Sequence, residues 1–146
     1  MFAEGEIIYF DPFYFKNGNT AKEKYCLILK VSGTQSIVAS LPTRKDNIPT
    51  EHENETGCIE LPESNLNCFV IPADSQVTTN GNSFPFRTHL YGHEVDAYEL
   101  DTMKEIYVIE GTDYVRWGQM LPEMFEEIIK CFKNSNSVKR GIKKLL

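Results

Sequence analysis

Short apolar segments alternate with polar turns through the first seventy residues of the chain. Apolar, aromatic and β-branched residues fill five segments: residues 6–10, 25–31, 36–41, 57–61 and 67–71. Segments of this length and composition, separated by turn residues, are typical of β-strands. Prolines follow four of them and, lacking a backbone donor, are expected to end the strands. We therefore expect a small antiparallel barrel or sandwich.

The pattern changes after residue 72. Turn residues dominate 74–95, and we interpret this segment as a surface insertion that folds back over the barrel. Further on, the pattern predicts a short helix over 100–105 and a strand over 106–109, while 114–117 fits no single element. These residues belong to the C-terminal part of the chain, which is mainly helical.

The clearest helix lies over residues 121–132. Pro122 stands near its start, acidic residues fill its first turns and lysines its last, which suits the helix dipole. Apolar residues recur at helical spacing on one face, which is expected to pack on the barrel or on a partner subunit. A second short helix is expected over 137–146.

Length and composition place the chain in one domain. Its 146 residues comprise a barrel core (5–72), the insertion (74–95) and the helical part (97–146), and 41% of them are hydrophobic. No apolar run approaches the roughly 20 residues that a membrane span needs. The first residues carry neither a basic patch nor an apolar stretch, so we expect no signal peptide and a cytoplasmic protein.

Four cysteines, at positions 26, 58, 68 and 131, form no Cys-x-x-Cys pair. Cys26 and Cys68 lie inside apolar runs, where cysteine acts as a small hydrophobic residue. We interpret the cysteines as buried free thiols in a reducing cytosol, with a disulfide framework or a zinc site as alternatives.

Charge is distributed unevenly along the chain. Residues 1–127 carry nine basic and 21 acidic residues, a net of −12, whereas the remainder carries six basic residues and no acid. An acidic body repels phosphate backbones at long range and argues against nucleic-acid chemistry. The basic tail fits the cationic end of a helix.

The order of the N-terminal segments resembles that of the MazF/PemK family of bacterial toxins. Residues 5–11 resemble the family's opening Gly-Asp-[Ile/Val]-x-x-x-Asp, and 24–29 resemble its Arg-Pro-[Ala/Val]-Leu-Val-[Leu/Ile]. Residues 37–43 resemble a third strand that ends in threonine or serine, and 67–71 its Ser-x-[Val/Ile]-Leu strand. The helix over 121–132 is similar to the family's terminal helix.

This resemblance implies an SH3-like barrel that dimerises, binds a small antitoxin protein and cleaves single-stranded RNA without a metal or cofactor. In the family, an arginine and a threonine at the barrel rim act on the scissile phosphate, and the antitoxin covers that groove. The threonine corresponds to Thr43. The arginine corresponds to Lys24, a point charge where arginine offers a planar fork.

The residues themselves also favour a site at this end of the barrel. If the second and third strands form a hairpin, Lys24, Thr43 and Arg44 meet at one end. Lys24 can stabilise a pentavalent phosphate, Thr43 can donate to it, and Arg44 can supply the bidentate fork. Ordinary polar residues at strand ends are the alternative.

Two further groups of residues are candidates for binding. The first long loop offers residues that can stack on bases or contact phosphates, as single-strand binders do: Tyr14, Lys16, Asn17 and Asn19. His89 and His93 stand four residues apart, a metal spacing on a helix, but Gly92 argues against a helix there. They are interpreted as loop or packing residues, or as acid–base groups with Arg87 and Asp96.

Two other functions remain open at this stage. One is a non-catalytic barrel that binds a protein partner, and the other is a poison of DNA gyrase of the CcdB kind. Several aromatic residues provide either a partner-binding face or core filling: Phe84, Phe86, Tyr91 and Trp117.

Overall fold

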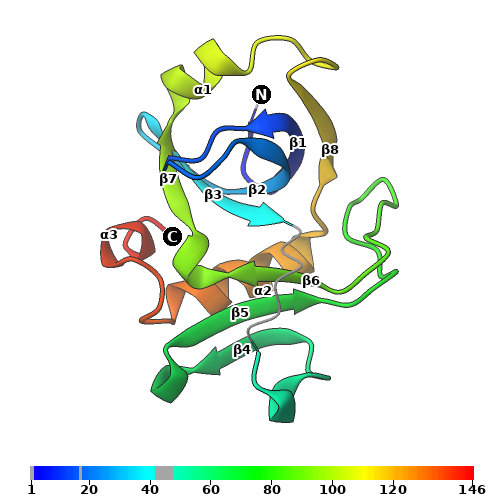
Figure 1. Cartoon of the computed structure of the whole chain (residues 1–146), viewed down its shortest axis with the longest axis vertical. Helices are drawn as coiled ribbons and strands as arrows, with labels where there is room; N and C mark the ends of the chain where they lie inside the picture. Colours follow the sequence, from blue (N-terminus) through cyan, green and yellow to red (C-terminus); the bar gives the residue numbers. More distant parts are fainter. Residues whose placement is uncertain (1, 17, 42–47) are drawn as a thin grey trace.

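The computed structural model describes residues 2–16, 18–41 and 48–146, which fold mostly as β-structure with a C-terminal helix. One antiparallel sheet has the strand order β7-β3-β2-β1-β8, and a second has the order β4-β5-β6 (Figure 1). The strands are β1 (Glu6–Phe13), β2 (Lys22–Ser32), β3 (Gln35–Leu41), β4 (Gly57–Leu61), β5 (Leu66–Ile71), β6 (Thr88–Tyr91), β7 (Asp96–Glu99) and β8 (Tyr114–Gln119). Among the described residues no strand belongs to both sheets, so strand pairing does not close a barrel.

Three α-helices and three 3-10 turns complete the described part of the chain. The α-helices are α1 (Leu100–Ile106), α2 (Pro122–Lys133) and α3 (Arg140–Lys143), and the turns are η1 (Thr50–His52), η2 (Pro62–Ser64) and η3 (Gly92–Glu94). The α2 helix contacts β4 and β5, whereas α1 contacts β7 at the other end of the molecule (Figure 1). Within the described residues, no helix is long and apolar enough to cross a membrane.

The core is divided by the two sheets. The largest cluster fills the space between them and includes Leu27, Phe69 and Phe132. A second cluster lies on the other face of the five-stranded sheet and joins Phe10, Cys26 and other residues to α1 through Met103. Alternate residues of β2 therefore enter different clusters, because successive strand side chains point to opposite faces.

The five predicted strands form, but the first is longer than expected. Pro12 was expected to end it, and that expectation is wrong, since β1 continues to Phe13. The pairing of β1 with β2 shifts register between Phe10 and Phe13, so Pro12 falls where the regular ladder is interrupted. An irregularity of this kind tolerates a residue that has no N–H to donate.

Segment 74–95 is more than a surface insertion. Residues 88–91 form β6 and pair with β5, and the side chains of Val77 and Phe84 are buried between the sheets. Its alternation is short and interrupted by turn residues, and only the tertiary contacts make it part of the core.

The strand expected over 106–109 is also absent. Helix α1 ends at Ile106, and the N–H groups of Val108 and Ile109 donate to the carboxylate of Asp113 (3.0 and 2.8 Å). A side-chain acceptor thus replaces the partner strand that these β-branched residues favour. The helices expected over 100–105 and 121–132 are confirmed, and α3 is shorter than the predicted 137–146.

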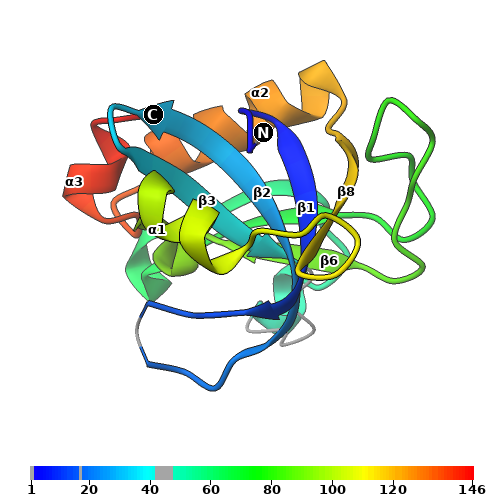
Figure 2. The ribbon, with the colours of Figure 1, turned by 90° about the horizontal axis from the view of Figure 1, so that it is seen from above.

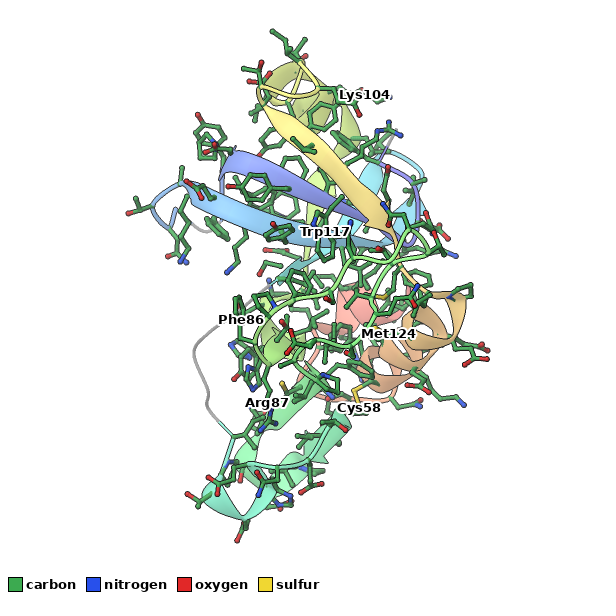
Figure 3. The ribbon with its side chains drawn as sticks, turned by 90° about the vertical axis from the view of Figure 1, so that its right-hand side faces the viewer. Cys58, Phe86, Arg87, Lys104, Trp117 and Met124 are labelled. Carbon is green, nitrogen blue, oxygen red and sulfur yellow. A yellow bond between two sulfur atoms is a disulfide. The ribbon has the colours of Figure 1, made fainter. Side chains whose placement is uncertain are left out.

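The cysteines do not all remain free. Cys58 of β4 and Cys131 of α2 form a disulfide across 73 residues of sequence (Figure 3), whereas Cys26 and Cys68 are buried and belong to no disulfide. The expectation of four free thiols is therefore wrong for one pair. The two cysteines meet only because α2 packs on β4, a contact that sequence spacing does not reveal.

Candidate functional site

A polar pocket of about 550 Å³ opens around Lys24, and we call it the Lys24 pocket. Its walls come from four separate stretches of the chain: residues 13–24, 38–40, 93–98 and 139. Strands β1, β2, β3 and β7 contribute, with the loop after β1, the η3 turn and Lys139 before α3. Its lining residues are Phe13, Phe15, Asn19, Lys22, Lys24, Val38, Ser40, His93, Glu94, Asp96, Tyr98 and Lys139.

The alternation of β2 explains why lysines reach this position. Cys26 and Ile28 point into the cluster beneath α1, and Lys24 and Lys22 continue the same face towards the strand's beginning. The apolar face of the strand therefore becomes cationic where it leaves the core. Figure 2 shows this end of the β1–β2 hairpin extending away from the body of the molecule.

Lys24 is only partly exposed, and this changes its acidity. Burial lowers the pKa of Lys24 below the ordinary 10.5, and the neighbouring charge of Lys22 acts in the same direction. The Glu94 carboxylate opposes both effects. A lysine with a lowered pKa is both a positive charge and a proton donor that works closer to neutral pH.

Asp96 organises two lysines at the rim of the pocket. Its Oδ1 lies 3.6 Å from Nζ of Lys16, and its Oδ2 lies 3.2 Å from Nζ of Lys139. Burial acts to raise the pKa of Asp96, but the Ala97 N–H and the Lys139 and Lys16 ammonium groups outweigh it and leave the pKa below 3.8. Asp96 is therefore ionised at neutral pH.

The remaining polar groups add acid–base capacity. The imidazole Nε2 of His93 lies 3.8 Å from Oε1 of Glu94, and both residues are exposed at the pocket's edge. Burial raises the pKa of Tyr98 to about 12, so its hydroxyl stays protonated. The pocket lining carries three lysines and two carboxylates, a net positive charge on a chain whose net charge is −6.

The predicted site residues divide into separate groups. Asn19 lines the Lys24 pocket, and Lys16 adjoins it through Asp96. Tyr14 lies elsewhere: its side chain lines two hollows beside α1. Asn17, Thr43 and Arg44 lie outside the described residues. The pairing of Tyr25 with Leu41 brings the end of β3 next to the beginning of β2, where Lys24 stands.

Of the three additional candidates, His93 alone lines the Lys24 pocket. Arg87 (Figure 3) donates hydrogen bonds to the backbone carbonyls of Glu53 and Glu55 and so links the segment before β4 to the segment before β6. His89 is buried in β6, its ring stacked 6.0 Å from that of Tyr91. Within the described ranges, no three His, Cys, Asp or Glu residues gather to hold a metal.

The aromatic residues considered as a partner-binding face mostly fill the core. Phe84 is buried and stacks on Trp117 with ring centroids 4.6 Å apart, and Tyr25 packs edge-on against both. Tyr91 is buried on the outer side of the three-stranded sheet. The interpretation as a docking face is therefore wrong for Phe84 and Tyr91.

Sequence reasoning missed several residues of the pocket. Lys22 was identifiable from strand alternation, since it stands two residues before Lys24 on the same strand face. Lys139 was interpreted as a helix-end charge, and nothing in the sequence relates it to β2. The strand that carries Asp96 and Tyr98 was not predicted, because four residues give too short an alternation.

The chain has no significant match among family models, curated proteins or solved structures. The function of the chain is therefore inferred from the side chains that line the Lys24 pocket. Its essential elements are a partly buried lysine, further lysines around it, and an imidazole at its edge.

Proposed function

We propose that this chain is a MazF/PemK-like growth-inhibiting toxin with an SH3-like arrangement of strands, which cleaves single-stranded RNA in the Lys24 pocket. The proposal includes action in the cytoplasm as a homodimer, without a metal, and control by a small antitoxin protein. The single observation that supports it is the half-buried Lys24 within a net positive pocket on an acidic chain. Lysines so placed attract a phosphodiester despite the repulsion of the remaining surface.

The pocket can supply the charge and the proton transfers that RNA cleavage needs. The 2′-oxygen forms a bond to phosphorus while the bond from phosphorus to the 5′-oxygen breaks. His93 accepts the proton of the 2′-hydroxyl, and the Lys24 ammonium donates a proton to the departing 5′-oxygen. Lys22 and Lys139 stabilise the negative charge on the pentavalent phosphate.

Other candidate residues have roles in binding. Asn19 lines the pocket and can donate to a phosphate or a base. Thr43 and Arg44, which follow β3 in the sequence, are proposed to contact the same phosphate, Arg44 by the bidentate geometry that Lys24 does not offer.

The test is cleavage of a labelled single-stranded RNA by the purified protein in the presence of EDTA. We expect cleavage by the wild type, no cleavage of the matching DNA, and a loss of about 100-fold for Lys24→Met. Lys30→Met is the matched control, because Lys30 is a half-buried lysine on the same strand that lies outside the pocket. If the wild type leaves RNA intact, the proposal is wrong.

The pH dependence of cleavage separates a proton donor from a simple charge. With Lys24 as donor, activity declines on the alkaline side at a pH below 10.5, because burial lowers its pKa. Lys24→Arg keeps the charge but does not release a proton in this range, so we expect a low rate without that alkaline decline. An unchanged profile in Lys24→Arg would contradict the assigned role.

Two alternatives remain as different outcomes of these experiments. Residues 1–127 carry a net charge of −12, which favours a non-catalytic protein that binds a partner. That function predicts intact RNA and unchanged DNA supercoiling. A gyrase poison of the CcdB kind predicts inhibited supercoiling with intact RNA.

A further inference from the structure

Two adjoining hollows lie beside α1, and we call them together the α1 groove. They measure about 340 and 370 Å³ and share Tyr14, Ile106 and Tyr107 in their walls. Figure 1 shows α1 at the end of the molecule remote from the three-stranded sheet. The groove shares only Tyr98 with the lining of the Lys24 pocket, so it is a separate feature of the surface.

Large apolar side chains are exposed in this groove and just beyond it. Tyr14 is 51% exposed, Ile106 41%, Val108 63% and Ile109 57%. Single exposed apolar residues are ordinary, whereas a contiguous group on a soluble protein marks an interaction site. Tyr14 and Ile106 line both hollows, and Val108 and Ile109 stand just beyond them, because their N–H groups bind the carboxylate of Asp113, which lines one hollow.

Hydrogen bonds fix the backbone of Tyr14, Val108 and Ile109 in place. Tyr107 is buried, and its hydroxyl accepts a hydrogen bond of 2.9 Å from the backbone N–H of Tyr14. The Asp113 carboxylate accepts the N–H groups of both Val108 and Ile109. The apolar residues are thus fixed in an exposed position by polar contacts, which reduces the entropy that a partner must overcome.

The surroundings of the groove are acidic. Asp11 and Asp113 line one hollow, and Glu99 lines the other together with Lys16, so the lining of the groove carries three carboxylates and one ammonium group. Residues 99–113 contain five acidic residues and one basic residue. An apolar groove with an acidic border is complementary to a segment that carries apolar residues flanked by lysine or arginine.

We propose that the α1 groove binds a cationic amphipathic segment of a partner protein. Apolar side chains of the segment enter the two hollows, and its basic side chains lie against Asp11, Glu99 and Asp113. A second copy of this chain fits less well, because a two-fold contact would bring two acidic borders together. The proposal is independent of RNA cleavage in the Lys24 pocket.

The direct test uses a fluorescein-labelled lysine–leucine peptide of about 14 residues with leucines at helical i, i+3 and i+4 spacing. Its scrambled form, of identical composition and charge, is the control for unspecific attraction. By fluorescence anisotropy we expect the amphipathic peptide to bind the wild type at least about tenfold more tightly than the scrambled peptide. Equal binding of the two peptides overturns the proposal.

Variants of the groove locate the binding site. Tyr14→Ser with Ile106→Ser removes the two exposed apolar side chains that line both hollows, and we expect about tenfold weaker binding. Val115→Ser is the matched control, because Val115 is 43% exposed on β8 but lines neither hollow, and its binding is expected to match the wild type. If the double variant binds like the wild type, the proposal is wrong. Circular dichroism of each variant confirms that it is folded.

Charge and self-association complete the test. Asp11→Asn with Glu99→Gln is expected to weaken binding and to reduce its dependence on salt. Lys24→Met is expected to bind the peptide normally, so a failure of RNA cleavage does not affect the result. A dimer in sedimentation that is lost only in the Tyr14/Ile106 double variant assigns the groove to a second copy and overturns the proposal.

Discussion

Nζ of Lys139 lies 3.2 Å from Oδ2 of Asp96 and joins the C-terminal basic segment to strand β7 at the rim of the Lys24 pocket. The two residues are 43 positions apart, and Lys16 approaches the other oxygen of the same carboxylate at 3.6 Å. One carboxylate therefore holds two lysines from opposite ends of the chain. This arrangement converts the basic tail from an isolated charge cluster into a wall of the pocket.

Removing the Asp96 charge should lower stability at neutral pH. The folded state holds its pKa below 3.8, so its stabilising effect is present above about pH 4 and is lost as pH falls further. We expect Asp96→Asn to reduce the free energy of unfolding by about 0.5–1 kcal/mol at pH 7 and by less at pH 3. Urea unfolding at both pH values measures this, with Glu105→Gln on α1 as a surface control. An equal loss at both pH values would contradict the role of the charge.

Lys24 should reduce stability, in keeping with a functional rather than a structural role. Its lowered pKa means that the folded state holds the ammonium less well than the unfolded chain, and this cost disappears as pH rises towards 10.5. Lys24→Met is expected to raise the free energy of unfolding at pH 7 by about 0.5 kcal/mol, a value reduced for solvent screening. Urea unfolding at pH 7 and pH 10, with Lys30→Met beside it, measures the effect. A loss of stability in Lys24→Met would argue for a structural lysine.

The disulfide between Cys58 and Cys131 should stabilise the attachment of α2 to the three-stranded sheet. It closes a long loop, and links of this kind stabilise proteins by about 2–4 kcal/mol. We expect dithiothreitol to lower the melting temperature of the wild type and to leave Cys58→Ser with Cys131→Ser unaffected. Cys26, which is buried and belongs to no disulfide, supplies the control: Cys26→Ala should keep the response to the reductant. Equal melting with and without reductant would show that the bond does not form.

Arg87 should stabilise the fold and should not act as a catalytic group. Its guanidinium donates to the carbonyls of Glu53 and Glu55, so Arg87→Met releases the segment that precedes β4. We expect faster proteolysis between residues 50 and 57 and a loss of about 1–2 kcal/mol in the free energy of unfolding. RNA cleavage per folded molecule should be unchanged, and Arg140→Met on exposed α3 should alter neither quantity. A selective loss of cleavage would place Arg87 in the site.

The local elements of this protein were largely predictable from its sequence. Strands β2 to β5 and helices α1 and α2 follow from apolar periodicity and turn residues, because these elements bury one face or one run of their own side chains. Periodicity misled at residues 106–109, where Asp113 binds the N–H groups that a partner strand would otherwise bind. A single acceptor four or five positions away has no periodic signature.

Within the candidate site, the sequence by itself identified Lys24, Asn19 and His93, because each is a polar residue in a recognisable motif, loop or spacing. Only the tertiary structure decided that Lys22 and Lys139 stand beside them, that Tyr14 belongs to the α1 groove, and that Cys58 meets Cys131. The physical reason is the same in each case. Sequence patterns record which face of an element is apolar, whereas the meeting of distant polar groups depends on how whole elements pack.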